Sequence, residues 1–309
     1  MRSFLEVAGM AMVLLILVIG CIVFVPQFSS IENLKGLLLS VSLVGMIAAT
    51  MLFCLAAGDF DLSIGSTVAL TGVLSALMVG KWGMPVWAAI VGPVAVGVII
   101  GWINGFVIAK IGINALITTL ATMQIVRGAA YLITNGSSIG ISDEKFLSYG
   151  DWHFLELHAH VWYMIAFFVI FGALLNRTIF GRNTLAVGGN TEASTLSGIN
   201  VSRVKVGIFA MQGAVAAFAG VMLAARVSSG NPDTQKGLEL QVISSCVLGG
   251  VSLTGGVGSI SGVIVGVMIM GVVQNAMNLK NIDQFWQYVA SGTVLLAAVM
   301  FDRLKARRT

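Results

Sequence analysis

Apolar stretches of about twenty residues dominate the sequence, and they restrict the environment in which the chain can fold. Residues 34–57, for example, contain a single charged side chain, Lys35. A helix of about 20 apolar residues spans the hydrocarbon core of a bilayer. Of the 309 residues only 10% are charged, against roughly 25% in a soluble domain. Because so few polar side chains could not cover a water-facing surface, we predict an all-α, polytopic integral membrane protein.

About ten stretches have this character, and polar residues, glycine or proline separate them. The first stretch resembles a signal peptide, but its apolar run continues past Cys21, where a processed lipoprotein would turn polar. We therefore predict an uncleaved first span and a single transmembrane domain over residues 1–309. The predicted spans are residues 7–25, 34–57, 64–79, 85–109, 114–134, 161–175, 206–225, 240–255, 257–279 and 285–301.

Two polar loops of opposite charge determine the expected orientation. Residues 176–205 carry four basic side chains against one acid, whereas residues 135–160 carry four acids against one lysine. Since Lys and Arg are retained on the cytoplasmic side, we expect residues 176–205 inside and residues 135–160 outside. An even number of spans then places both termini in the cytoplasm, which suits the basic tail of residues 302–309.

The basic loop contains a candidate short helix at residues 191–197. Asn190 or Thr191 would supply its N-cap, and Gly198 would end it. The alternative interpretation is a solvated connector, whose charges only set the orientation of the chain.

Two glycine-rich breaks, Gly58–Ser63 and Gly249–Ser259, each follow an apolar stretch and precede a helix rich in small residues. Residues 58–66 recur loosely at 250–259, with a register shift of about two residues. In many transporters, internal repeats carry broken helices at corresponding places along the pathway. The alternative is an ordinary pair of turns, in which Asp61 or Ser63 merely caps the next helix.

Polar side chains within or beside the spans are the candidates for a substrate pathway, because polar groups in lipid usually face a cavity or a partner. Most are neutral amides and hydroxyls, which suit a neutral, polyhydroxylated solute. For each of these side chains, the alternative role is hydrogen bonding between helices. For Arg127, a further alternative is that its side chain snorkels toward the membrane interface. The candidates are Asp59, Asp61, Asn104, Asn114, Thr118, Thr119, Gln124, Arg127, Gln274, Asn275 and Asn278.

Motifs for catalysis are absent from the sequence, including G-x-x-x-x-G-K-[ST], H-E-x-x-H and G-x-S-x-G. The cysteines lie within apolar runs and show no metal spacing. Of the three histidines, His153, His158 and His160, none has an acid or cysteine spaced along the chain to complete a ligand set. We expect neither an enzyme nor a metal or other cofactor. The positive charges lie at loops and ends, so we expect no nucleic-acid partner.

Three ordered motifs resemble those of monosaccharide ABC-transporter permeases. Gly58-Asp-Phe-Asp-Leu-Ser-Ile-Gly65 resembles the family's G-G-I-D-L-S-V-G pattern. Residues 180–199 resemble its cytoplasmic F-G-R-x-x-x-A-x-G-G-N segment, and residues 247–256 resemble a third stretch. The likeness runs from about residue 24 to residue 303. Residues 57–62, 114–128 and 275–279 resemble the arabinose branch of the family. That branch is also similar at Asp59, where many other members have glycine.

The resemblance implies the membrane subunit of an ATP-driven, binding-protein-dependent sugar importer of the bacterial inner membrane. Its partners would be a cytoplasmic ATPase subunit, a periplasmic sugar-binding protein, a second permease copy and membrane lipid. The short helix would fit a groove of the ATPase. The alternatives are a permease for ribose, xylose or galactose, a stand-alone carrier or channel, and least favoured an intramembrane enzyme. The implied ATPase-coupling residues are Arg182, Gly188, Gly189, Asn190, Glu192, Ala193 and Gly198.

Overall fold

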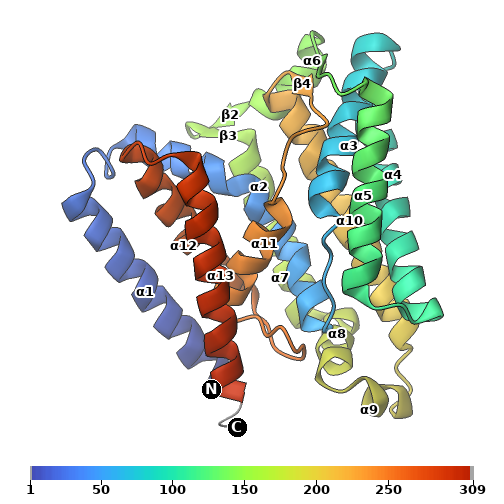
Figure 1. Ribbon diagram of the computed structural model, residues 1–309, viewed down its shortest axis with the longest axis vertical. Helices are drawn as coiled ribbons and strands as arrows, with labels where there is room; N and C mark the ends of the chain where they lie inside the picture. The colour runs from blue at the N-terminus through green and yellow to red at the C-terminus, as the bar shows by residue number, and fades with distance from the viewer. Residues whose placement is uncertain (1, 307–309) are drawn as a thin grey trace. The chain divides into compact units, whose positions relative to one another are not determined.

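The computed structural model describes residues 2–306 and is helical along most of that length (Figure 1). The chain divides into two compact units, each assembled from segments that are distant in the sequence. Unit 1 consists of Met1–Gly58, Ala166–Gly189 and Leu240–Thr309. Unit 2 consists of Asp59–Ile165 and Asn190–Glu239.

Unit 1 is built around α2, whose second half is buried throughout. Phe53 of α2 stacks on Phe180 and meets Phe171 edge to face, with centroid separations of 6.1 and 6.2 Å. These aromatic contacts join α2 to α7 and α8. The helices of unit 1 are α1 (Arg2–Phe24), α2 (Ile31–Ala56), α8 (Ile179–Gly189), α12 (Ile260–Leu279), α13 (Gln284–Ala306) and the larger parts of α7 (Ala159–Arg177) and α11 (Leu238–Leu248).

Unit 2 is built on the close contact of α4 with α10. A Cβ at Gly101 would lie 2.0 Å from the carbonyl oxygen of Phe209, and a Cβ at Gly213 would lie 2.1 Å from that of Gly97. Small residues allow helices in lipid to approach in this way. The helical elements of unit 2 are α3 (Ile64–Ala76), η1 (Leu77–Lys81), α4 (Val86–Phe106), η2 (Val107–Ile111), α5 (Ala115–Thr134), α6 (Glu144–Asp151), α9 (Thr191–Leu196) and α10 (Val201–Arg226).

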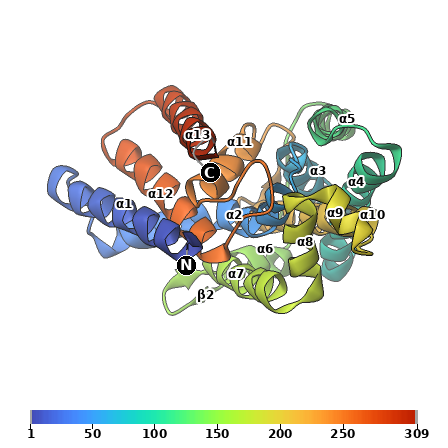
Figure 2. The same cartoon turned by 90° about the horizontal axis from the view of Figure 1, so that it is seen from below.

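The two predicted loops of opposite charge reach opposite ends of α10, which at 26 residues is about 39 Å long. At one end, Ser202 Oγ donates to the carbonyl oxygen of Ala109 at 3.0 Å, close to where α9 precedes α10 (Figure 2). At the other end, Gly150 of α6 packs against the backbone of Arg226. Four short strands also belong to unit 2, with β1 (Ile139–Gly140) paired to β4 (Ser229–Gly230) and β2 (His153–Phe154) paired to β3 (Leu157–His158).

The all-α, polytopic prediction is confirmed. In the described part of the chain, seven helices are long and apolar enough to cross a membrane, namely α2, α3 with η1, α4 with η2, α5, α7, α10 and α12. The count of ten spans and the side of each terminus remain predictions. The span predicted at residues 240–255 is wrong in its extent, because α11 ends at Leu248 and Gly250 turns into the left-handed region at φ +81°. With 11 residues, α11 reaches about 16 Å.

Candidate functional site

The break between α2 and α3 is held by a buried carboxylate. Asp61 is 1% exposed, and its Oδ1 accepts from the backbone N–H of Ser63 at 2.9 Å and from the Ser63 hydroxyl at 2.6 Å. This is a turn closed by an aspartate side chain. The capping role predicted for Asp61 is therefore wrong in detail, because the carboxylate binds the residue before α3 and not the free N–H groups of its first turn. Ser63 occupies the N-cap position without a side-chain capping bond.

A hydrogen-bond relay connects this turn to α4 and α5. Thr122 Oγ1 donates to Asn104 Oδ1 at 2.6 Å, and Asn104 Nδ2 donates to Ser63 Oγ at 3.1 Å. The Ser63 hydroxyl in turn donates to Asp61 Oδ1, so all three hydrogen bonds run in the same direction, from Thr122 to Asp61. Asn104 is fully buried, so its amide depends on these partners. The structure thus brings together Asp61 and Asn104, two of the predicted pathway residues.

The other acid of the break, Asp59, forms an ion pair with α10. Asp59 Oδ2 lies 2.8 Å from Lys205 Nζ, and both side chains are largely buried. From the sequence, Lys205 was expected only to add to the positive charge of the loop at residues 176–205. Its contact with Asp59 connects the break to the first turns of α10, which residues 197–200 join to α9.

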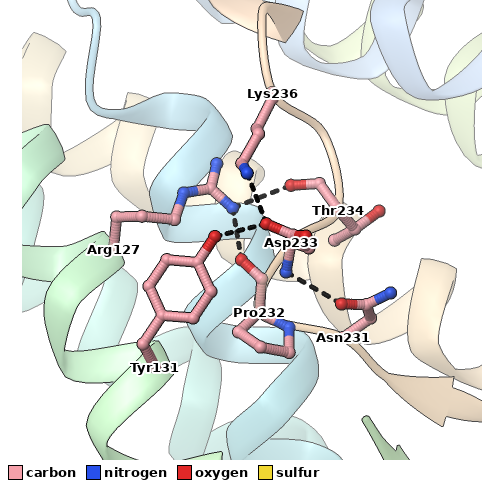
Figure 3. A network of polar contacts seen from close by, with 7 residues as sticks. All are labelled: Arg127, Tyr131, Asn231, Pro232, Asp233, Thr234 and Lys236. Atoms are coloured by element: carbon pink, nitrogen blue, oxygen red, sulfur yellow. Dashed lines mark hydrogen bonds and ion pairs between the residues drawn. The ribbon is translucent and has the colours of Figure 1, made fainter. Parts of the chain in front are cut away.

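Arg127 fixes the segment that leads into α11 (Figure 3). Its Nη1 donates to the carbonyl oxygens of Pro232 and Thr234 at 2.7 and 2.8 Å. An arginine that only snorkelled would direct its guanidinium to water or headgroups, whereas this one satisfies backbone acceptors of its own unit.

The same segment carries a second set of polar contacts, on Asp233. Its carboxylate accepts hydrogen bonds from Lys236 and from the Tyr131 hydroxyl, and its backbone N–H donates to Asn231 Oδ1 at 2.8 Å (Figure 3). The hydrogen bonds from Lys236 and Tyr131 hold the pKa of Asp233 below its ordinary value. Sequence reasoning missed Tyr131 and Asp233, since nothing along the chain indicates that α5 meets residues a hundred positions later.

The start of α3 lies against the start of α11. A Cβ at Gly65 would be 2.7 Å from the carbonyl oxygen of Gln235, 2.7 Å from Glu239 Oε2 and 3.7 Å from an Arg127 nitrogen. The N-terminus of a helix favours a nearby anion, so the Glu239 carboxylate suits this position. Two short helices whose N-terminal ends meet at a polar centre are the arrangement found at substrate sites of many transporters.

Little empty space accompanies this centre. A cavity of about 20 Å³ is lined by Val68, Gly72, Gly220 and Thr234, among others. It has room for a water molecule and not for a sugar.

The remaining candidates of α5 bond within their own helix or face outward, except that the Thr119 hydroxyl also reaches the Phe60 carbonyl oxygen of the break at 3.4 Å. Asn114 caps the helix, its side chain accepting from the backbone N–H of Leu116 at 2.9 Å. The hydroxyls of Thr118 and Thr119 donate to carbonyl oxygens one turn earlier, at 3.1 and 2.8 Å. Gln124 is exposed and has the strongly exposed Ile125 beside it.

Three candidates lie in unit 1, and each joins two helices there. Asn275 of α12 and Asn33 of α2 exchange two amide hydrogen bonds, at 2.8 and 3.0 Å. Gln274 accepts from Gln241 at 2.9 Å, and Asn278 accepts from Gln287 at 2.6 Å. These pairs fit the alternative role of hydrogen bonding between helices.

The short helix of the basic loop is present as α9. Asn190 caps it by accepting from the backbone N–H of Ala193 at 2.8 Å, and Gly198 follows it with φ +82°. Glu192 and Ala193 are exposed, and Leu196 is 85% exposed. The helix therefore presents both charged and apolar side chains to its surroundings. Sequence reasoning missed α8, which carries Arg182 exposed on its surface.

Backbone packs closely on backbone at the end of α8. We call this place the glycine junction and define it as Ala56, Gly188, Gly255 and Gly256 of unit 1. A Cβ at Gly188 would lie 1.8 Å from the carbonyl oxygen of Ala56 and 2.7 Å from the backbone nitrogen of Gly256. The Gly256 N–H donates to the same Ala56 oxygen at 2.9 Å. Gly189, by contrast, has only an ordinary contact, 3.9 Å from Gly256. Within unit 1, the first residue of the other break is also close, because a Cβ at Gly255 would lie 3.0 Å from the Gly58 nitrogen.

Comparisons with known proteins agree with one another. A family model described as "Branched-chain amino acid transport system / permease component" matches residues 33–299. The chain is 54% identical to the L-arabinose transport system permease protein of Escherichia coli (strain K12), over 97% of the chain and 92% of that protein. It is 50% identical to the L-arabinose ABC transporter permease protein of Azospirillum brasilense, over 96% and 88% of the two chains. It is 40% identical to the ribose import permease protein of Bacillus subtilis (strain 168), over 95% and 91%. No solved structure matches the chain.

Proposed function

The chain belongs to the family of permease components of ABC importers, and from this premise we propose that it carries L-arabinose across the bacterial inner membrane. The observation that carries the choice of sugar is the difference in identity between relatives. Relatives described as L-arabinose permeases are 54% and 50% identical to this chain, whereas the ribose permease of B. subtilis is 40% identical. The buried polar groups of unit 2 suit a sugar, since amides and hydroxyls such as Asn104 and Thr122 can exchange their mutual bonds for bonds to hydroxyl groups.

We propose that a separate cytoplasmic ATPase supplies the energy and docks on α9. Three features support this role. The helix is capped at both ends, exposes Leu196 and Glu192, and is joined by residues 197–200 to α10, where Lys205 binds the break through Asp59. A displacement of α9 would therefore be transmitted to the break through the short connection of residues 197–200, the first turns of α10 and the Lys205–Asp59 salt bridge.

We propose further that a periplasmic binding protein delivers the sugar and that a second copy of the permease completes the pathway. Gln124 supports the second copy, because a polar side chain exposed on an apolar span face usually meets a cavity or a partner. The small size of the cavity inside unit 2 supports it as well.

The test is uptake of radiolabelled L-arabinose by a host that lacks its own arabinose permease but keeps the matching ATPase and binding protein. Expression of this chain is expected to restore uptake, and excess unlabelled ribose, xylose or galactose is expected to compete weakly. If the chain instead restores ribose uptake in a host that lacks its ribose permease, the substrate is ribose and the proposal of L-arabinose is wrong.

A stand-alone carrier is the second candidate, and the same host distinguishes it. Inactivating the ATPase is expected to abolish uptake while leaving the permease in the membrane. Uptake that persists without an active ATPase would contradict the importer proposal.

The orientation needs its own measurement. With the native cysteines replaced, a cysteine at position 190 is expected to react with an impermeant reagent only from the cytoplasmic side. Labelling of position 190 from outside would reverse the proposed arrangement of partners.

A further inference from the structure

The segment between α6 and α7 contains a hairpin that places two imidazoles side by side. Strands β2 and β3 pair antiparallel, with His153 opposite His158. Leu155 and Glu156 form the two-residue turn with φ values of 48° and 60°, as a type I′ hairpin requires. The two Nε2 atoms lie 3.4 Å apart. Because the register is fixed by the turn, this pairing is a property of the backbone.

Aromatic contacts hold the hairpin against the beginning of α7. Trp162 Nε1 donates to the carbonyl oxygen of Phe154 at 3.1 Å, and the two rings pack at 5.3 Å. Trp152 Nε1 donates to the Tyr163 hydroxyl at 3.0 Å. These contacts hold the hairpin backbone that carries the two imidazoles in place before any ligand arrives, which favours a binding site.

An acid completes the group. Asp151, the last residue of α6, offers a carboxylate oxygen, and the three ligand atoms of Asp151, His153 and His158 all lie within 4.8 Å of one another. Its neighbour Gly150 packs closely on α10, since a Cβ there would lie 2.5 Å from the backbone nitrogen of Arg226. From the sequence we expected no ligand set, because no acid or cysteine is suitably spaced along the chain. Spacing along the chain does not reveal residues that a hairpin brings together.

The separation of the two nitrogens matches a tetrahedral metal. Two imidazole nitrogens bound to zinc at 2.0–2.1 Å with a tetrahedral angle are about 3.4 Å apart. A hydrogen bond between the imidazoles would explain the pair alone, but it gives no role to the carboxylate beside them. Two imidazoles and a carboxylate are a common donor set for zinc, with the fourth position left to water.

We propose that Asp151, His153 and His158 bind one divalent transition-metal ion of the zinc class, which fixes the hairpin between α6 and α7. The charge pattern predicts this segment outside the membrane, where a delivering protein would approach. The metal is structural in this proposal and takes no part in moving the substrate.

The test uses the purified full-length permease in nanodiscs, with an affinity tag that contains no histidine. Titration with Co²⁺ is expected to give the visible absorption of a tetrahedral site, saturating at one ion per chain and displaced by Zn²⁺. His153→Ala and the double variant His153→Ala/His158→Ala are expected to weaken binding roughly tenfold or more, and Asp151→Asn less.

Glu156→Gln is the matched control, because it removes an acid from the same hairpin that does not belong to the cluster. It is expected to bind Co²⁺ like the unchanged protein. His153 is exposed, so its replacement leaves the packed side chains in place.

Thermal unfolding gives a second readout. Zn²⁺ is expected to raise the unfolding midpoint of the unchanged protein and of Glu156→Gln, but not that of the double variant. Binding of equal strength in the double variant, or binding to the unchanged protein without saturation at one ion, would overturn the proposal.

Discussion

The polar break of unit 2 and the glycine junction of unit 1 are two solutions to the same problem, which is how irregular backbone is held within a membrane protein. In unit 2, Asp61, Ser63, Asn104 and Thr122 surround the break with side-chain hydrogen bonds. In unit 1, Gly188 and Gly256 contribute no side chain at all, and backbone meets backbone. The first solution depends on which side chains are present, and the second depends on their absence. The first should therefore tolerate chemically similar replacements, whereas the second should tolerate none.

The largest effect is expected for Gly188→Ala. The new methyl group would lie 1.8 Å from the Ala56 oxygen, and backbone on both sides leaves it no room to move. We expect a loss of stability of about 3 kcal/mol or more, at the upper end of overpacking costs, and loss of uptake. Thermal unfolding in detergent and the amount of protein in the membrane are the measurements. Gly189→Ala is the matched control, because its methyl group meets nothing closer than 3.9 Å. Equal behaviour of the two variants would remove the distinction between the two regions.

A smaller effect is expected when the ion pair of the break is opened. Asp59→Ala leaves the Lys205 ammonium in a largely buried position without its partner, and Lys205→Ala leaves the carboxylate. Each is expected to cost about 2–3 kcal/mol, and each is expected to reduce uptake. The double variant Asp59→Leu/Lys205→Met is expected to regain stability, since it leaves no unpaired charge. It is expected not to regain uptake if the pair transmits movement of α9 to the break. Full recovery of uptake in the double variant would reduce the pair to a structural contact.

Asp61 tests whether the polar break tolerates a similar side chain. Asp61→Asn keeps an oxygen that can accept from the backbone N–H and the hydroxyl of Ser63. Asp61→Ala removes that acceptor and leaves both donors buried, which is expected to cost about 1–3 kcal/mol. Uptake at matched permease levels is expected to fall more in the alanine variant. If asparagine proves as harmful as alanine, the negative charge matters and the hydrogen-bond explanation is wrong.

The smallest effect on stability, with a large effect on function, is expected at α9. Glu192 and Ala193 are exposed, so Glu192→Lys and Ala193→Trp are expected to leave unfolding within about 0.5 kcal/mol of the unchanged protein. Both are expected to weaken co-purification of the ATPase and to lower uptake, and Glu192→Gln is expected to be milder, because it adds no repulsion. Normal association and normal uptake in both variants would leave α9 a solvated connector.

The sequence predicted the features that depend on neighbours along the chain. The cap of α9, for which the sequence offered Asn190 or Thr191, and its end at Gly198 are local, so three or four residues suffice to indicate them. The end of α11 was predicted too late, because an apolar stretch does not reveal that Gly250 adopts a left-handed conformation.

Features that depend on distant contacts were not predictable in the same way. Asn104 was selected because it is polar within a span, but its pairing with Ser63 and Thr122 needs three helices placed side by side. Arg127 was selected for the same reason, and snorkelling was its alternative. Only the folded chain identifies its acceptors, the carbonyl oxygens of Pro232 and Thr234. Polarity in an apolar stretch therefore indicates that a residue has a partner without indicating which one.

The glycine contact between α4 and α10 also has a consequence for synthesis. Gly101 and Phe209 meet backbone to backbone, yet about a hundred residues separate them. A ribosome adding 5–20 residues per second needs on the order of 5–20 s to make that interval. Throughout this period the face of α4 that carries Gly97 and Gly101 lacks the helix it packs against in the folded chain. Correct pairing of α4 therefore waits for the synthesis of α10, and any helix that packs on this face earlier must leave it before unit 2 can form.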